Sequence, residues 1–167
     1  NWHSDWSFQA RPPAGTCLYG IKIPPVGGDT LFANQHAALD AMPDALRNRV
    51  EGRMAIHSAK RAYAPDGFYG EGDKAKRSMD IRPSKDAEAT QLHPYIRAHP
   101  ETGRLGLFSC FGYIIGFEGM DDAEALPLAR DLVAKAPAGR ASAEARHVLG
   151  YIQRRLGDYS HAAETLL

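Results

Sequence analysis

The chain has no excess of charge of either sign. Lys and Arg total 20 of its 167 residues, and Asp and Glu total another 20. No long run of one sign occurs, which argues against nucleic acid or an anionic membrane as a partner bound through bulk electrostatics. The sequence also lacks the run of about 18 apolar residues that a membrane-spanning helix needs. Its apolar content of 44% is typical of a soluble globular protein.

Cysteine is scarce, and the first residues do not have the pattern of a signal peptide. The two cysteines, Cys17 and Cys110, form no Cys-x-x-Cys pair and lie in apolar stretches. We therefore expect two buried free thiols in a reducing compartment rather than a disulfide, and a cytoplasmic protein. No basic-then-apolar segment opens the chain, and its first residue is Asn1 rather than Met. This start predicts a fragment or a processed N-terminus.

The first third of the chain predicts strands followed by helices. Residues 16–23 are rich in β-formers and predict a mostly buried strand, and residues 29–32 predict a short second strand. The Pro- and Gly-rich residues 24–28 between them predict a turn. Asn34 can then cap a helix with apolar positions every three or four residues, and Pro43 begins a second helical segment.

The remaining elements alternate between strands and irregular sequence. Residues 53–57 predict a strand, and residues 94–99 and 105–108 predict a hairpin around a turn. Residues 60–90 are polar, glycine-bearing and aperiodic, which is typical of a functional lid or a disordered loop. From residue 121 onward the apolar period becomes helical.

The candidate for metal chemistry is the pair His3 and Asp5. On an extended segment, side chains at i and i+2 point to the same side, where one divalent metal could take both. An imidazole and a carboxylate are two ligands of the 2-His-1-carboxylate triad of non-haem Fe(II) oxygenases. The tripeptide alone is expected at chance level, so an exposed pair near a frayed terminus is the alternative.

Several further blocks accompany this pair in a fixed order. They are Trp2–Phe8, Pro12-Pro13, Pro24–Asn34, His93–Arg104 and Gly112–Met120. Together they resemble the taurine dioxygenase (TauD/TfdA) family of Fe(II)- and 2-oxoglutarate-dependent dioxygenases, over roughly residues 1–133.

The resemblance implies a fold and a site. The expected fold is α+β, an incomplete double-stranded β-helix (jelly roll) with flanking helices and the metal at its mouth. His3 and Asp5 match two iron ligands, and Thr30 matches the threonine whose hydroxyl helps to hold 2-oxoglutarate. Without the resemblance, Thr30 would be an ordinary β-branched strand residue.

Other positions are implied as substrate contacts. Asn1 and Trp2 adjoin the metal pair and could reach the primary substrate. Tyr113 falls near a family position whose aromatic ring lines the substrate pocket, with a core role as the alternative. His57 lies in the segment that borders the substrate site in the family.

Two histidines and two arginines of the hairpin block receive structural interpretations. His93 and His99 flank a predicted strand and do not match iron ligands in the family pattern. Arg97 and Arg104 do not match the 2-oxoglutarate arginine, so we expect them on a solvated face.

The distal block of the family does not occur in this sequence. A Trp-Asp-Asn-Arg segment, the second metal histidine and the 2-oxoglutarate arginine should follow the helix near residue 134. Only His147 and His161 remain downstream, both within predicted helical sequence.

The tail has a different signature. Residues 137–167 resemble one tetratricopeptide-repeat unit, a helical hairpin, although a simple amphipathic helix pair packed on the β core is the alternative. We therefore expect a partial TauD/TfdA-like domain at 1–133 and a TPR-like helical tail at 134–167.

Two functions follow from these readings. The first is a dioxygenase that uses Fe(II) and 2-oxoglutarate to hydroxylate a small anionic organic substrate. The second is a catalytically inactive, truncated or fused fragment whose tail binds a protein partner or a second copy of the chain.

Overall fold

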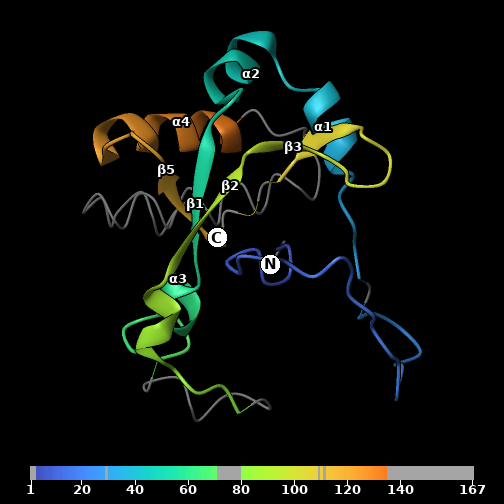
Figure 1. Cartoon of the computed structure of the whole chain (residues 1–167). Helices are drawn as coiled ribbons and strands as arrows, with labels where there is room; N and C mark the ends of the chain where they lie inside the picture. Colours follow the sequence, from blue (N-terminus) through green and yellow to red (C-terminus); the bar gives the residue numbers. More distant parts are fainter. Residues whose placement is uncertain (1–2, 29, 71–79, 109, 111, 135–167) are drawn as a thin grey trace.

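The computed structural model describes residues 3–28, 30–70, 80–108, 110 and 112–134, and shows antiparallel strands covered by helices (Figure 1). In chain order the elements are α1 (Gln35–Asp40), α2 (Asp44–Val50), β1 (Met54–Ser58), α3 (Lys60–Tyr63), the 3-10 helix η2 (Lys85–Glu88), β2 (Thr90–Pro94), β3 (Ile96–Ala98), β4 (Leu105–Leu107), β5 (Ile114–Phe117) and α4 (Asp122–Ala134). Among these helices, none combines the length and the apolar character that crossing a bilayer requires.

The three-stranded sheet has the order β2-β1-β5, with β1 in the middle. Both neighbours of β1 are antiparallel to it, so that Ala55 lies between His93 on β2 and Phe117 on β5. The strand predicted at residues 53–57 is confirmed, and Ala55 and His57 are buried on one face of it. Helices α2 and α4 pack on this sheet and complete its apolar core. The buried core residues are Leu46, Val50, Ala55, Tyr95, Ile114, Phe117, Ala125, Leu128 and Leu132.

Two predicted helix starts are confirmed. The Asn34 side chain accepts hydrogen bonds from the backbone N–H groups of His36 and Ala37, at 3.0 Å each, and so caps α1. Pro43 is the N-cap residue of α2.

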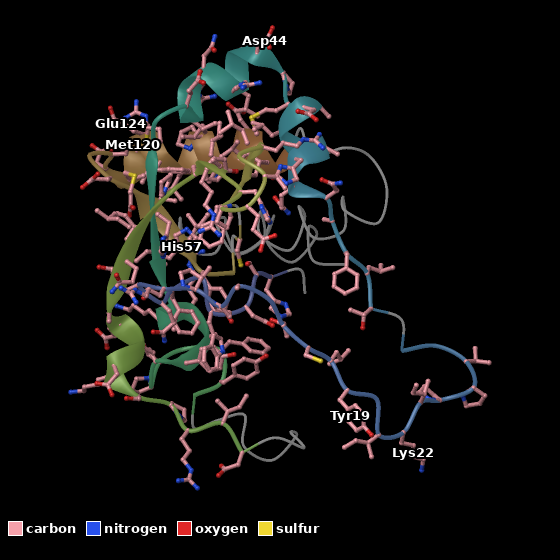
Figure 2. All side chains as sticks on the ribbon, turned by 45° about the vertical axis from the view of Figure 1, so that its right-hand side comes forward. Tyr19, Lys22, Asp44, His57, Met120 and Glu124 are labelled. Carbon is pink, nitrogen blue, oxygen red and sulfur yellow. The ribbon has the colours of Figure 1, made fainter. Side chains whose placement is uncertain are left out.

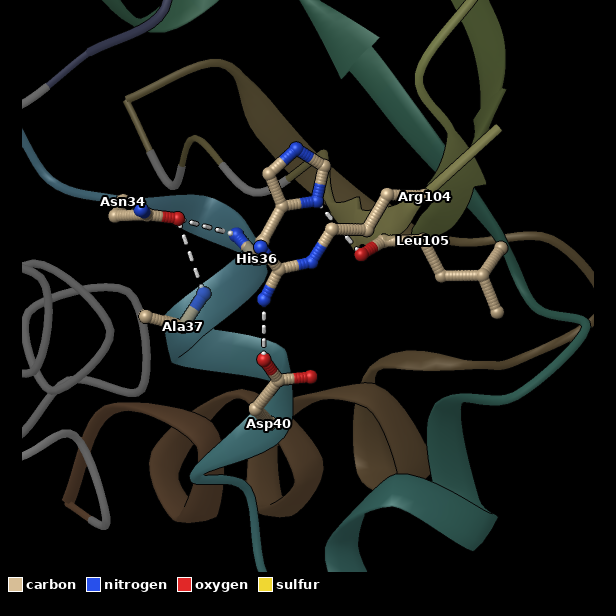
Figure 3. A network of polar contacts seen from close by, with 6 residues as sticks. All are labelled: Asn34, His36, Ala37, Asp40, Arg104 and Leu105. Atoms are coloured by element: carbon tan, nitrogen blue, oxygen red, sulfur yellow. Dashed lines mark hydrogen bonds and ion pairs between the residues drawn. The ribbon is translucent and has the colours of Figure 1, made fainter. Parts of the chain in front are cut away.

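The hairpin β3-β4 is also confirmed, and α1 is fastened to it (Figure 3). The Nδ1–H of His36 donates to the Leu105 carbonyl oxygen at 2.7 Å, because a carbonyl can only accept. Arg104 pairs with Asp40 at 2.6 Å on the exposed side of the same contact. Gly106 allows the close approach, since a Cβ there would stand only 2.8 Å from His36 Nδ1.

The predicted strands at 16–23 and 29–32 are wrong for the residues that the structure describes. Residues 16–28 and 30–33, which we call the apolar arm, form no helix or strand and are exposed throughout. The arm leaves the body of the molecule, with Tyr19 and Lys22 far from His57 (Figure 2). β-formers fit a pleated surface between neighbours, and the arm has no neighbouring strand among the described residues. Cys17 lies on it and is exposed, whereas Cys110 is buried as expected.

The expected lid at 60–90 is partly structured. It contains α3 near its start and η2 near its end, while residues 71–79 lie outside the described residues. The proposed helical hairpin and TPR-like unit at 137–167 also lie outside them. The two antiparallel sheets fit the expected α+β class, and within the described residues they do not close into a barrel.

Candidate metal site

His3 and Asp5 come together at the start of the described chain. His3 Nε2 lies 2.9 Å from Asp5 Oδ1, and both side chains are partly exposed to solvent. Two adjacent ligands bound to one divalent metal at about 2.1 Å each stand about 3 Å apart. The nitrogen and oxygen donors therefore already have the separation that a shared metal needs.

The pair lies outside any strand, and Asp5 is the first residue of a turn. His3 and Ser4 belong to no helix or strand, and a turn spans residues 5–8, with Gln9 N–H donating to the Trp6 carbonyl at 2.9 Å. Trp6 has a φ of +52°, which is the left-handed region that a bulky residue rarely adopts. The predicted convergence is thus present, although the two residues belong to no strand.

Asp5 is also oriented from the apolar arm. The Thr16 hydroxyl donates to Asp5 Oδ2 at 2.6 Å, while His3 faces the other oxygen, Oδ1. One carboxylate oxygen thereby accepts from a neutral donor, and the other faces the His3 imidazole. Sequence reasoning missed Thr16, because nothing in its local context distinguishes it from other strand-forming residues.

The turn rests on two buried histidines of the central sheet. His57 Nδ1 lies 2.9 Å from Ser7 Oγ, and both residues are fully buried. His93 Nε2–H donates to the Gln9 carbonyl at 2.9 Å. Burial, with smaller contributions from His93 and Arg97, lowers the pKa of His57 to about 4, so this imidazole is neutral at pH 7. The structural interpretation of His93 agrees with this contact.

Phe108 joins these histidines to Arg97. Its ring stacks on His57 with a centroid separation of 5.3 Å, and the Arg97 guanidinium carbon lies 3.7 Å from the Phe108 centroid. Arg97 is half-buried, and burial lowers its pKa. The solvated face expected for Arg97 is therefore wrong, because its guanidinium stacks on an aromatic ring. For Arg104, which is exposed, the expectation is confirmed.

Tyr113 is buried in the core. Its ring meets Phe8 edge-on at 4.9 Å. Burial raises the pKa of Tyr113, with smaller contributions from its surroundings, Tyr63 first. These contacts agree with the core alternative, and the role of Tyr113 as a substrate contact stays a prediction.

The other predicted residues are not brought to the pair. Thr30 is exposed, and within the described chain no hydrogen bond joins it to His3 or Asp5. Asn1 and Trp2 lie outside the described residues. Across the described ranges, no group of three or more His, Cys, Asp or Glu side chains could hold a metal. The structure thus presents two donors for a metal rather than a complete site.

The two converging donors, the antiparallel sheets and the flanking helices can be compared with known proteins. The family model "Taurine catabolism dioxygenase TauD, TfdA family" matches residues 1–145. The chain belongs to the TauD, TfdA family. The match extends past residue 133, where we place the domain boundary, and that boundary stays a prediction.

Relatives in the TauD, TfdA family support this membership. The alpha-ketoglutarate-dependent 2,4-dichlorophenoxyacetate dioxygenase of Cupriavidus pinatubonensis is 34% identical over 107 residues, which cover 64% of this chain and 34% of the relative. A taurine dioxygenase from Burkholderia xenovorans aligns with a TM-score of 0.60 and 27% identity, over 81% of this chain and 40% of that one. AAD-2 in complex with Mn(II) and N-oxalylglycine aligns with a TM-score of 0.56 and 27% identity, over 83% and 51%.

The similarity covers only a part of each relative. The chain spans 26% to 40% of the length of the first curated relatives that it matches. The structures that it resembles are TauD-type dioxygenases, which have the jelly-roll fold, and it covers 39% to 51% of them.

Proposed function

We propose that this chain contributes the first two metal ligands of an Fe(II)- and 2-oxoglutarate-dependent dioxygenase. The observation that carries the proposal is the convergence of His3 Nε2 and Asp5 Oδ1 at 2.9 Å in a chain of the TauD, TfdA family. AAD-2, a structural relative, binds Mn(II) and N-oxalylglycine. N-oxalylglycine has the two carboxylates and the chelating oxo group of 2-oxoglutarate, which supports a divalent metal and 2-oxoglutarate as the groups bound here.

Different residues of the chain would have different roles in such a site. His3 Nε2 and Asp5 Oδ1 would hold Fe(II), while the Thr16 hydroxyl donates to the other oxygen, Oδ2, and orients the carboxylate. When bound, Fe(II) with 2-oxoglutarate and O₂ supplies the oxidising power for C–H hydroxylation. Thr30 as a contact for 2-oxoglutarate, and Asn1, Trp2 and Tyr113 as substrate contacts, stay predictions.

We infer a small anionic organic substrate. Two of the relatives are named for 2,4-dichlorophenoxyacetate and for taurine, which carry a carboxylate and a sulfonate respectively. The chemistry shared by these molecules is an anionic head on an unreactive carbon skeleton. A small-molecule substrate, rather than nucleic acid or a membrane, also agrees with the balanced charge of the chain.

An inactive role is the second candidate, and one observation favours it. No third His, Cys, Asp or Glu joins His3 and Asp5 among the described residues. In this reading the chain is an incomplete jelly roll whose tail, a TPR-like helical hairpin at 134–167, binds a protein partner or another copy. These features, the 1–133 boundary and a cytoplasmic location stay predictions.

Metal titration tests the proposal. We expect Mn(II), followed by its electron paramagnetic resonance signal, to bind the wild-type chain at one site, and His3→Ala or Asp5→Ala to weaken this binding about tenfold or more. His99→Ala removes an exposed histidine outside the pair and should leave the affinity unchanged. Equal Mn(II) affinity in all four proteins would reject the assignment of the ligands.

Turnover tests the inactive role. With Fe(II), ascorbate and 2-oxoglutarate, we expect no release of succinate from the 167-residue chain, because two protein ligands hold iron more weakly than three. Succinate release that depends on His3 and Asp5 would contradict the inactive role.

A further inference from the structure

The apolar arm begins with a segment of strand length, residues 16–23, whose large apolar side chains lie in water. These side chains are 79% to 91% exposed, and they belong to Leu18, Tyr19, Ile21 and Ile23. Figure 2 shows Tyr19 and Lys22 on the arm, far from His57 in the body of the molecule. Soluble proteins rarely leave a large contiguous apolar surface in water, so this segment marks a contact surface for another chain.

The same segment has the composition of a strand with one apolar face. In an extended conformation, successive side chains point to opposite sides, so every second residue lies on one face. Cys17, Tyr19, Ile21 and Ile23 share such a face. Aromatic and β-branched side chains pack well between neighbouring strands. The surface therefore suits the addition of a strand.

This face is complementary to itself when two copies run antiparallel. With a two-fold axis at Gly20, Tyr19 of one copy stands opposite Ile21 of the other. The same axis places Cys17 opposite Ile23. An aromatic residue opposite a β-branched one is a favourable cross-strand pair. All four positions of the apolar face thus find an apolar partner in a second copy.

Charge does not oppose the pairing of two copies. Lys22, the only charged residue of residues 16–23, stands opposite Leu18 of the second copy, so the two lysines do not face each other. The whole chain has 20 basic and 20 acidic residues and a formal net charge of zero at pH 7. Net charge therefore gives no repulsion between copies, and proteins near zero net charge associate more readily.

The exposed area suits a weak dimer. The large apolar side chains of residues 16–23 present on the order of 400 Å² of apolar surface per copy. Because a little over half of an interface is apolar, this corresponds to roughly 700 Å² of total surface per copy. A standard interface buries about 800 Å² per partner. A two-stranded ribbon is marginally stable by itself, so we expect a dissociation constant on the order of tens of micromolar.

We propose that residues 16–23 of the apolar arm pair antiparallel with the same residues of a second copy of the chain, about a two-fold axis at Gly20. The bend at Ile21 and Lys22 straightens in the paired arm. At about 1 µM, well below the dissociation constant, the chain is a monomer with an exposed arm. The inference concerns the arm alone and does not depend on the proposed function.

Sedimentation velocity of the full chain between about 1 and 300 µM tests the proposal. We expect a monomer–dimer equilibrium for the wild-type chain, and association at least about tenfold weaker for Ile21→Lys, because a charge then lies in the middle of the paired face. Val26→Lys is the matched control. Val26 is 88% exposed and lies on the same arm beyond Pro24 and Pro25, which cannot donate to a ladder. This variant should dimerise as wild type does.

Three results would overturn the pairing. The first is a wild-type chain that stays monomeric up to about 300 µM. The second is unchanged dimerisation in Ile21→Lys, which would place the contact elsewhere. The third is an equal loss in Ile21→Lys and Val26→Lys, which would show an unspecific effect of charge. Wild-type thermal midpoints at about 1 µM show that the variants fold. Should Ile21→Lys fold poorly, Tyr19→Lys, at a position 85% exposed, replaces it.

Disulfide trapping tests the register. Cys17 is exposed and Cys110 is buried, so Cys17 is the thiol open to oxidation. Ile23→Cys introduces a thiol opposite Cys17 of the second copy, where Cβ atoms about 4.5–5.5 Å apart allow a disulfide after a small adjustment. The two Cys17 residues of a wild-type dimer stand roughly 20 Å apart.

Under mild oxidation we expect covalent dimers in Ile23→Cys and few in the wild-type chain. Lys22→Cys is the control, because its thiol points to the other face of the strand. Equal yields of covalent dimer in Ile23→Cys and Lys22→Cys would overturn the register centred on Gly20.

Discussion

The apolar arm and strand β1 were both predicted to be strands, but only β1 is one. Residues 16–23 of the arm contain β-formers and large apolar side chains, as does Met54–Ser58 of β1. In the arm, Leu18, Tyr19 and Ile21 are 80% to 91% exposed. In β1, Ala55 and His57 are fully buried between two antiparallel neighbours.

The difference lies in what surrounds each segment. The propensity of a residue for a strand measures how well it packs between cross-strand neighbours. β1 has β2 and β5 beside it and helix α4 packed against β5, whereas the arm has no paired strand within the described residues. The arm meets the body through a polar contact, from Thr16 to Asp5, rather than through its apolar side chains.

The largest effect should come from truncating matched aromatics in the two regions. Phe117 on β5 is 1% exposed and Phe32 on the arm is 90% exposed. We expect Phe117→Ala to lower the free energy of unfolding by about 3–5 kcal/mol, because it leaves a cavity in the core. Phe32→Ala should change it by less than about 0.5 kcal/mol. Urea unfolding at pH 7 measures both, and similar losses would show that the arm is packed in solution.

A second prediction uses the buried histidine of β1, since the arm contains no histidine. The pKa of His57 falls from 6.5 to about 4 on folding, so the unfolded chain binds the proton more tightly. The stabilisation from the neutral imidazole is complete above pH 6.5 and is lost as the pH falls toward 4. This difference corresponds to about 3 kcal/mol of unfolding free energy.

Unfolding curves at several pH values between 7 and 4 check this expectation. In His57→Asn the unfolding free energy should fall less between pH 7 and pH 4, by nearly the amount given above, because asparagine does not titrate. His99→Gln, which removes an exposed histidine, should leave the slope as in wild type. If the unfolding free energy of His57→Asn depends on pH as in wild type, then folding does not lower the pKa of His57.

The smallest effect concerns two glycines. A Cβ at Gly106 of β4 would stand 2.8 Å from His36 Nδ1, whereas a Cβ at Gly15, just before the arm, would meet nothing within 4 Å. Gly106→Ala should displace His36 from Leu105 and cost about 1–2 kcal/mol. Gly15→Ala should be neutral within about 0.5 kcal/mol. Thermal unfolding of both variants measures these effects. Equal midpoints would show that the His36 side chain moves aside without a loss of stability.

Local signals predicted several elements correctly. The Asn34 cap, the Pro43 start and the hairpin turn depend on interactions within a few residues, and all three are present. Strand β2 and the 3-10 helix η2 were missed inside or beside the supposed 60–90 loop. Their polar, exposed sequence carries no period, and β2 exists because it pairs with β1.

The site was predictable only in part. The family blocks led to His3 and Asp5, and their side chains do converge. Sequence reasoning missed Ser7 as an anchor, because its buried contact is with His57, 50 residues away. It could not find the contacts from Thr16 and Cys110, which lie 11 and 106 residues away from their partners.

By itself, the sequence determined the family of this protein, two donors suited to a metal, and the helices that begin with a local cap. These features depend on residue types, their order and short-range hydrogen bonds. Only the tertiary structure decided which β-forming segment became a strand and how the metal pair is held. Burial and pairing depend on residues far apart in the chain, and so do the buried contacts of His57 with Ser7 and of Cys110 with Ser4.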